Sequence, residues 1–188
     1  MRSFRTPRTI LILALLGLGA LAVVPASAAA SDGKTARATV RDANGAVLGS
    51  VTIQQADGKL VVVGILSGLT AGFHGFHIHT TGLCEAPFTT AGGHLNPGGT
   101  THGQHAGDLP SLKVSADGRA LAIFDTDSVT LAQIFDADGA AIIIHAAPDN
   151  FANIPTRYEA AGVPGPDAAT LATGDSGARV ACGVLTRG

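Results

Sequence analysis

The sequence predicts an all-β fold, an antiparallel β-sandwich or barrel, and three observations indicate it. Short runs rich in β-branched and other apolar residues recur along the chain, and no long helical period competes with them. Between many of these runs lie turn dipeptides that favour hairpins, namely Asn44-Gly45, Asp57-Gly58, Asp117-Gly118 and Asp138-Gly139. Strands joined in this way form an antiparallel sandwich or barrel.

Eight strands are predicted, in chain order, at residues 35–42, 46–56, 59–69, 72–80, 112–116, 119–125, 140–146 and 179–185. One helical turn is predicted within 128–135, because Leu131, Ile134 and Phe135 recur at helical spacing. Two long segments, 81–110 and 146–178, lack strand character and are rich in Gly, Pro, Thr and Asp. Loops of this length on a rigid sheet usually carry function, so we expect them to hold the site.

Residues 1–28 have the features of a secretory signal peptide. Three arginines precede an uninterrupted apolar run, and Ala26 and Ala28 then provide a small-residue cleavage site. We expect cleavage after Ala28, with Ala30 as the alternative, and a single domain over residues 29–188. The apolar run is short for a membrane span, and no cysteine near the site could carry a lipid, so no membrane anchor is expected after cleavage. The mature protein should therefore be secreted, into the periplasm or the cell-wall space.

The charge of the mature chain limits the binding partners to be expected, and its two cysteines predict a disulfide. Without the three arginines of the signal peptide, nine Lys and Arg remain against fourteen Asp and Glu, a formal charge near −5. This balance argues against a nucleic-acid partner. In an exported chain, the two cysteines, Cys84 and Cys182, are expected to bond to each other, and the alternative is two buried thiols.

Histidine is concentrated in one stretch, from Gly72 to Asp108, which indicates metal chemistry. Six of the seven histidines lie there (His74, His77, His79, His94, His102 and His105), and the seventh is His145. On a strand, His77 and His79 point to one face, as a chelating pair would. His74 shares the opposite face with apolar residues, so we expect it to be a buried, hydrogen-bonded core histidine.

The candidate ligands outnumber the needs of one four-coordinate metal, so two metals are predicted. They are His77, His79, His94, His102, His105, Asp108 and His145. A set of mostly neutral nitrogens, with Met1 as the only methionine, suits copper or zinc rather than magnesium or calcium. Because Asp108 lies three residues after His105, the grouping favours a closed, structural zinc site at His94, His102, His105 and Asp108, leaving an open site for a redox metal.

With these histidines, the sequence resembles that of the copper/zinc superoxide dismutases. The motifs GFHGFHIH, AGGHLNPGGTTHG, HAGDL, IIIHAAPD and GARVACGVL follow one another in that family's order and span most of the mature chain. The resemblance implies a Greek-key β-barrel of eight strands. It also implies an enzyme that dismutates superoxide to O₂ and H₂O₂ with a redox-cycling copper, bridged through a histidine to a structural zinc.

The resemblance also implies a role for each motif residue. His77, His79 and His145 would bind copper, His94 would bridge the two metals, and His102, His105 and Asp108 would complete the zinc site. Asp149 would accept hydrogen bonds from one histidine of each site, and Cys84 and Cys182 would form the family's disulfide. Arg179 would position the anion beside copper, and His94 with Arg179 would be the catalytic pair. A homodimer is a further hypothesis.

Two departures and two rival hypotheses accompany this interpretation. Only two residues separate His102 from His105, which looks like a shortened bacterial zinc loop, and segment 146–178 lacks the lysines of the family's electrostatic channel. One rival is an extracellular copper-binding or buffering protein with the same fold and little turnover. The other, a sandwich stabilised by zinc alone, leaves the copper-type histidines unused.

Overall fold

The computed structural model describes residues 34–188, and the predicted signal peptide, residues 1–28, lies outside them. The strands are β1 (Thr35–Asp42), β2 (Val47–Ala56), β3 (Lys59–Leu66), β4 (Gly72–His74), β5 (Phe76–His79), β6 (Leu112–Val114), β7 (Ala120–Thr126), β8 (Ala141–His145), β9 (Glu159–Ala160), β10 (Val163–Pro164), β11 (Arg179–Val184) and β12 (Thr186–Arg187). Two short helices, α1 (Leu131–Ile134) and α2 (Thr170–Thr173), and a 3₁₀ turn, η1 (Thr89–Ala91), interrupt the loops. Within the described part, no helix is long and apolar enough to cross a membrane.

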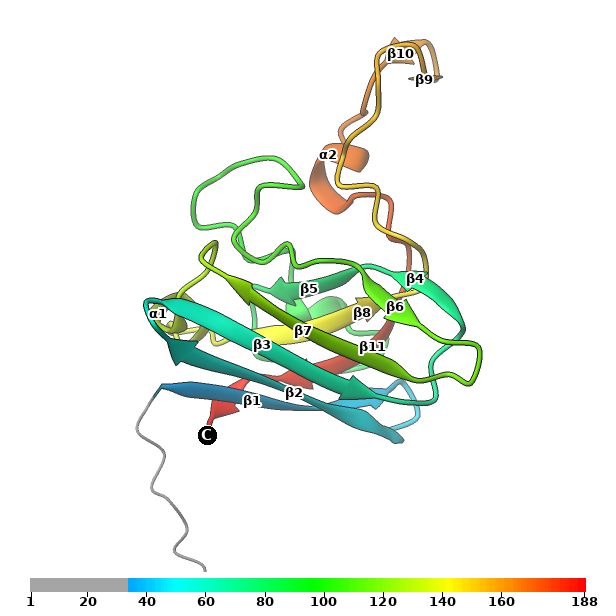
Figure 1. Cartoon of the computed structure of the whole chain (residues 1–188). Coiled ribbons are helices and arrows are strands. Elements are labelled where there is room, and N and C mark those ends of the chain that lie inside the picture. Colours follow the sequence, from blue (N-terminus) through cyan, green and yellow to red (C-terminus); the bar gives the residue numbers. More distant parts are fainter. Residues whose placement is uncertain (1–33) are drawn as a thin grey trace, which may run out of the picture. The chain divides into compact units, whose positions relative to one another are not determined.

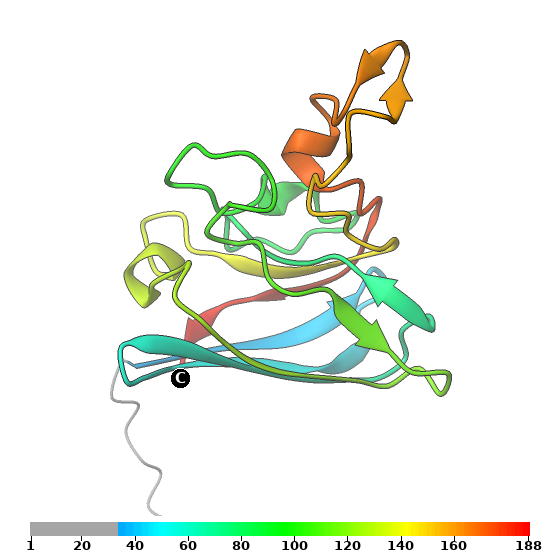
Figure 2. The same cartoon turned by 45° about the horizontal axis from the view of Figure 1, so that its top comes forward.

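Ten of these strands form one antiparallel sheet that curls into a nearly closed barrel, and β9 and β10 pair with each other in a separate hairpin (Figures 1 and 2). The strand order is β4-β6-β7-β3-β2-β1-β11-β8-β5, with β12 paired to β1. The two ends of this path are neighbours in the sequence, because only Gly75 separates β4 from β5. Pairing of β3 with β7, of β1 with β11 and of β5 with β8 joins strands that are distant in sequence, as in a Greek key. The predicted fold class is confirmed.

Alternating burial explains why these segments form a barrel. On β2 and β3, Val51, Ile53 and Val62 are fully buried and point into the core, while their neighbours face outward. Strand β8 is buried along its whole length, because its two faces pack against different groups. Ile142 and Ile144 belong to the main core, whereas Ile143 packs against a second cluster beneath the disulfide loop. The continuous apolar run of β8 therefore reflects burial on both faces.

Most predicted elements are confirmed, with three differences. The predicted strand 72–80 is two strands, because the chain leaves one end of the sheet at Gly75 and enters the other. Asp138-Gly139 forms a turn between α1 and β8 rather than a hairpin. The second long loop carries α2 and a separate β9–β10 hairpin, neither of which was predicted. The predicted helical turn is α1, whose N-cap Thr130 forms a capping box with Gln133.

Candidate metal centre

Three histidines share the outer surface of the β5–β8 strand pair. The register places His77 opposite Ile143, and His145 lies two residues further along β8, so both point away from the barrel core together with His79. Burial of these three rings, at 0 to 4% exposure, comes from the loops that cover them. His74 points inward instead, where its two ring nitrogens lie 2.6 Å from the carbonyl oxygen of His145 and 2.8 Å from that of Thr70. The directions predicted by strand parity are confirmed, with His77 and His79 on one face and His74 buried and hydrogen-bonded on the other.

The first long loop brings the remaining ligand candidates to this surface by pairing with β5. The amide of Leu95 donates to the carbonyl of Ile78 at 2.8 Å, and the amide of Ile78 donates to the carbonyl of Gly107 at 2.9 Å. Isolated β-bridges then set His94 beside His79 and Asp108 beside His77. The loop thus pairs with the free edge of β5. This pairing makes His94 and Asp108 neighbours of His79 and His77, although these residues are far apart in the sequence.

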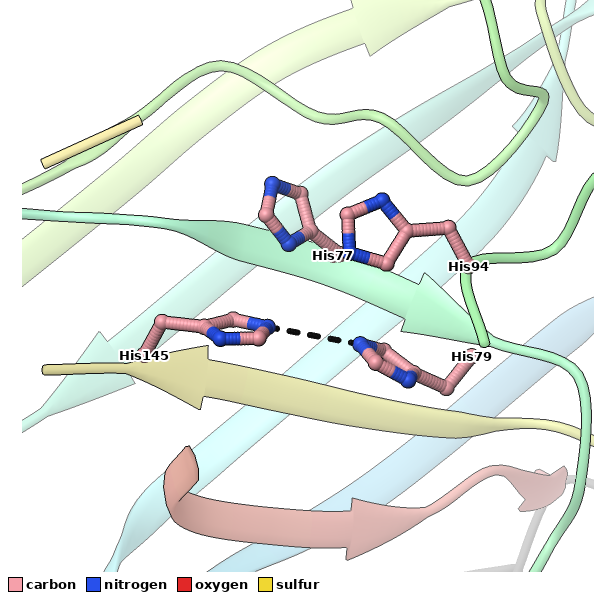
Figure 3. A group of neighbouring side chains, drawn as sticks. All are labelled: His77, His79, His94 and His145. Carbon is pink, nitrogen blue, oxygen red and sulfur yellow. Dashed lines mark hydrogen bonds between the residues drawn. The ribbon is translucent and has the colours of Figure 1, made fainter. Parts of the chain in front are cut away.

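His77, His79, His94 and His145 form the first group, and one nitrogen of each lies within 4.8 Å of the others (Figure 3). Hydrogen bonds decide which nitrogen faces the group. His79 Nδ1 lies 2.9 Å from the carbonyl oxygen of Gly92 and His145 Nδ1 lies 3.0 Å from that of Gly177. Their Nε2 atoms are left to face each other at 3.4 Å, the contact drawn in Figure 3.

His77 has the opposite arrangement, because its Nε2 lies 2.7 Å from Asp149 Oδ2 and its Nδ1 is left free. Among residues 34–188, His77 Nδ1 is the only buried side-chain nitrogen or oxygen without a hydrogen-bond partner. An orphaned buried polar atom is costly unless something binds it. Because the other histidines converge on the same point, a metal ion is the partner that this atom fits.

His94, His102, His105 and Asp108 form the second group, and its geometry is close to a tetrahedron. His94 Nδ1 lies 3.2 Å from His102 Nδ1, 3.4 Å from His105 Nδ1 and 2.9 Å from Asp108 Oδ1. Asp108 Oδ1 is 3.2 Å from Nδ1 of both His102 and His105. Zinc bonded to nitrogen and oxygen at about 2.0 to 2.1 Å has ligand–ligand edges of roughly 3.3 Å. Five edges of the group thus fit a zinc ion.

His94 belongs to both groups. Its Nδ1 faces the second group, so Nε2 is the nitrogen left for the first group. The rings of His94 and His77 lie 4.0 Å apart between centroids, which brings the two groups side by side. One imidazole could therefore hold two metal ions, one on each nitrogen.

Asp149 contacts one histidine of each group, on the ring nitrogen that points away from that group. Its Oδ2 lies 2.7 Å from His77 Nε2 and its Oδ1 lies 2.7 Å from His102 Nε2. The amide of Phe151 also donates to Oδ1, at 2.7 Å. Although burial would raise the pKa of Asp149, these hydrogen bonds hold it well below its usual range, so the carboxylate stays ionised. It fixes the orientation of one ring in each group.

The protonation of the histidines suits metal binding. Burial lowers the pKa of His79 to about 2 and that of His145 to about 3, and it also lowers the pKa of His77. Neutral imidazole is the form that binds a metal. Burial also opposes protonation of His102, but its hydrogen bonds with Asp108 and Asp149 outweigh burial and raise its pKa to about 9. The two carboxylates that stabilise a protonated His102 would also stabilise a metal cation bound in place of that proton.

Arg179 lies beside the first group. It lines a pocket of about 520 Å³ together with His94, His145 and Asp175. Its guanidinium donates to the carbonyl oxygens of Phe88, at 2.5 Å, and Gly92, at 2.6 Å. The Gly92 carbonyl also receives the His79 contact, so Arg179 and one histidine of the first group share an anchor.

Two glycines belong to the site and were not predicted. Gly92 supplies the shared carbonyl, and Gly174, at φ 60°, lets α2 end against the rings, because a Cβ there would collide with Asp149 and His102. The doublet Gly92-Gly93 before His94 and the pair Gly174-Asp175 were the available signals. Both indicate turns, yet neither shows what the backbone approaches.

The disulfide between Cys84 and Cys182 is present, with Cα atoms 5.6 Å apart and a sequence separation of 98. It attaches the first long loop to β11, the strand that also carries Arg179. The predicted pairing is confirmed, and the alternative of two buried thiols is wrong. The covalent link and the guanidinium contacts hold the same loop against the barrel.

Two adjoining groups of imidazoles that share one histidine, on the outside of a Greek-key barrel, define a dinuclear metalloprotein of the copper and zinc type. Residues 47–185 match the model of the copper/zinc superoxide dismutase family (SODC), and the chain belongs to this family.

Relatives and solved structures agree. A Cu-Zn superoxide dismutase from Mycobacterium tuberculosis is 43% identical over 166 residues, covering 80% of this chain and 69% of the relative. One from Caulobacter vibrioides is 37% identical over 165 residues, covering 80% and 85%. A crystal structure of a double mutant of a SOD-like protein from Bacillus subtilis aligns with a TM-score of 0.64 and 33% identity, over 79% of this chain and 95% of that chain.

Proposed function

We propose that this protein is a Cu-Zn superoxide dismutase, which converts two superoxide anions and two protons to O₂ and H₂O₂. The observation that carries the proposal is His94, whose two ring nitrogens face two different ligand groups. One of these groups borders a pocket that also contains the cation Arg179. A metal at an open site suits redox chemistry on a small substrate, whereas the closed second group suits a structural ion.

The geometry of the two groups supports one ligand set for each metal. We assign copper to His77, His79, His94 and His145, and zinc to His94, His102, His105 and Asp108. When bound, copper supplies the one-electron redox chemistry and zinc holds the bridging ring in place. Asp149 and the carbonyls of Gly92 and Gly177 keep the rings aimed at these positions, so little reorganisation is needed.

Arg179 and His94 act on the substrate. The guanidinium keeps its charge over the working pH range and is held by two carbonyls, so it presents a fixed cation at the pocket wall. Superoxide is a small anion, and the charge near −5 of the mature chain means that attraction has to be local. His94 lines the same pocket, and whenever its Nε2 is not bound to copper this nitrogen could hold and deliver one of the protons that peroxide formation needs.

The site of action is proposed from the N-terminal sequence. We propose that residues 1–28 are a cleaved signal peptide and that the domain of residues 29–188 works outside the cytoplasm, without a membrane anchor. The disulfide supports an oxidising compartment. N-terminal sequencing of the exported protein tests the cleavage site: a first residue of Ala29 supports cleavage after Ala28, and Ser31 supports cleavage after Ala30.

Metal analysis combined with superoxide-consumption kinetics tests the function. About one copper and one zinc per chain with rapid turnover is the expected result. Copper near one per chain with no turnover would support the rival function, an extracellular copper-binding protein. His74→Gln is a matched control, because His74 is a buried histidine outside both groups and its loss should leave the copper and zinc content unchanged.

A further inference from the structure

We propose that Phe151 helps to retain zinc at the second ligand group by covering His102. The inference rests on the proposed function, because it needs zinc at that group. The ring of Phe151 stacks on the imidazole of His102, with 19° between their planes and 6.4 Å between their centroids. Aromatic pairs are favourable at about 4.5 to 7 Å. An aromatic ring offers zinc no ligand atom, so Phe151 acts through His102, as a positioning residue.

The backbone of Phe151 contacts the same part of the site. Its amide donates to Asp149 Oδ1 at 2.7 Å, and this oxygen also lies 2.7 Å from His102 Nε2. Its carbonyl oxygen faces Gly103, where an added Cβ would lie only 2.6 Å away. The amide of Gly103 in turn donates to Asp108 at 2.7 Å. The ring, the amide and the carbonyl of one residue thus all meet the second group or its immediate supports.

The turn that carries Phe151 is strained. Phe151 and Ala152 have φ values of 55° and 53°, in the left-handed region that disfavours residues with a Cβ. Hydrogen bonds hold this turn: the amide of Ala152 donates to Asn150 Oδ1 at 2.8 Å, and Asn150 Nδ2 donates to Asp175 Oδ2 at 2.6 Å. Strain that the surroundings maintain is typical of functional positions. Here it places a large ring against His102.

The first long loop offers little cover of its own at this point. Only Gly103 and Gln104 separate His102 from His105, and the glycine has no side chain while Gln104 is exposed. His102 is nevertheless only 3% exposed. Phe151, at 42% exposure, contacts both the His102 ring and solvent. The second long loop therefore compensates for the short spacing in the first.

Two physical effects of this cover slow the loss of zinc. A ring packed on the imidazole hinders the rotation by which His102 would leave the metal. It also limits the access of water to the hydrogen bond between His102 and Asp149, and such a bond is stronger where water is excluded. Because Phe151 stacks on a histidine of the second group, we expect it to slow zinc release much more than copper release.

Zinc release from the metal-loaded, disulfide-bonded protein tests the proposal, with zinc captured by a chromogenic chelator and copper release followed in the same samples. Phe151→Ala should speed zinc release about fivefold, because an aromatic pair supports a ligand less strongly than a hydrogen-bonded carboxylate does. Copper release should stay close to that of the wild type. Phe151→Tyr keeps the ring and should restore slow zinc release. With Co²⁺ in place of zinc, the visible absorption bands should shift in Phe151→Ala, because they depend on ligand geometry.

Two control variants separate the ring from the backbone of the turn and from the loss of any surface aromatic. Ala152→Gly relaxes a left-handed residue and keeps the Phe151 ring, so the melting temperature should not fall and zinc release should be unchanged. Phe73→Ala removes a ring that is 52% exposed on β4 and should change the release of neither metal.

The outcomes that overturn the proposal differ from those that overturn the proposed function. A Phe151→Ala protein that releases zinc at the wild-type rate, or that loses both metals equally faster, would overturn the role of the ring alone. So would an Ala152→Gly protein that releases zinc as fast as Phe151→Ala, since the backbone of the turn would then be responsible. A wild-type protein that binds no zinc would overturn the zinc assignment and this proposal together.

Discussion

Replacing Arg179 by alanine should lower the rate of superoxide consumption at least tenfold. The side chain supplies the pocket wall with a fixed cation and donates to the carbonyls of Phe88 and Gly92. A tenfold loss equals about 1.4 kcal/mol of barrier. A unit charge attracts an anion by about this amount at roughly 6 Å and an effective dielectric of about 40, so the expected loss is reasonable for a guanidinium at the wall of a hydrated pocket.

The same substitution has a second, structural effect that must be separated from the loss of charge. Arg179 and His79 share the Gly92 carbonyl, so removing the guanidinium also frees part of the loop that orients a proposed copper ligand. Arg179→Gln keeps an NH₂ donor without the charge, and Arg179→Lys keeps the charge without the two-pronged donor. If charge dominates, the lysine variant should retain more activity than the glutamine variant.

Stopped-flow measurement of superoxide decay at several ionic strengths, alongside copper and zinc analysis, distinguishes the two effects. The wild-type rate should fall with added salt more steeply than that of Arg179→Ala, because salt screens the attraction that the variant lacks. Metal content should be equal in all variants. An alanine variant with wild-type activity and normal metal content would refute the role assigned to Arg179.

Three further predictions concern the metal centre and its support. His145→Ala should abolish turnover while zinc stays bound, whereas Asp108→Ala should mainly deplete zinc and lower the melting temperature; equal loss of both metals in both variants would contradict the assigned ligand sets. Asp149→Asn should lower the affinity for both metals, about 10- to 100-fold, because it weakens the support of one ring in each group, and competition with chelators would measure this. Reducing the bond between Cys84 and Cys182 opens a loop of 98 residues, so stability should fall by about 4 to 5 kcal/mol in the chain-entropy model. Calorimetry with and without reductant would check this, and an unchanged melting temperature and activity would show that the bond has no such role.

Much of the fold could be predicted because local signals agree with the final structure. The turn dipeptides Asn44-Gly45, Asp57-Gly58 and Asp117-Gly118 each join two paired strands, since the conformations they favour match the twist of a hairpin. The break at Gly75 could not be predicted, because the segment around it alternates like one strand. Only closure of the barrel requires its two halves to pair with different neighbours, β6 and β8.

The candidate site divides in the same way between sequence and tertiary structure. Strand parity alone separates His77 and His79 from His74, because the side-chain period of a strand is two residues. The clustering of histidines and the position of Asp108 then indicated the remaining ligands, the resemblance implied a role for each, and the structure gathers them into the two groups. The sequence could not predict which ring nitrogen of each histidine faces the metal position, because this depends on the hydrogen-bond acceptor that each ring contacts, such as the Gly92 carbonyl for His79.

The sequence by itself determined the fold class, the pairing of the cysteines and the residue types of a two-metal centre, because these follow from local pattern and ligand chemistry. Only the tertiary structure decided that Gly174 must lack a side chain and that Arg179 and His79 share one carbonyl. These contacts join segments far apart in the sequence. No local pattern records them, because they exist only once the barrel has closed and brought its two long loops together.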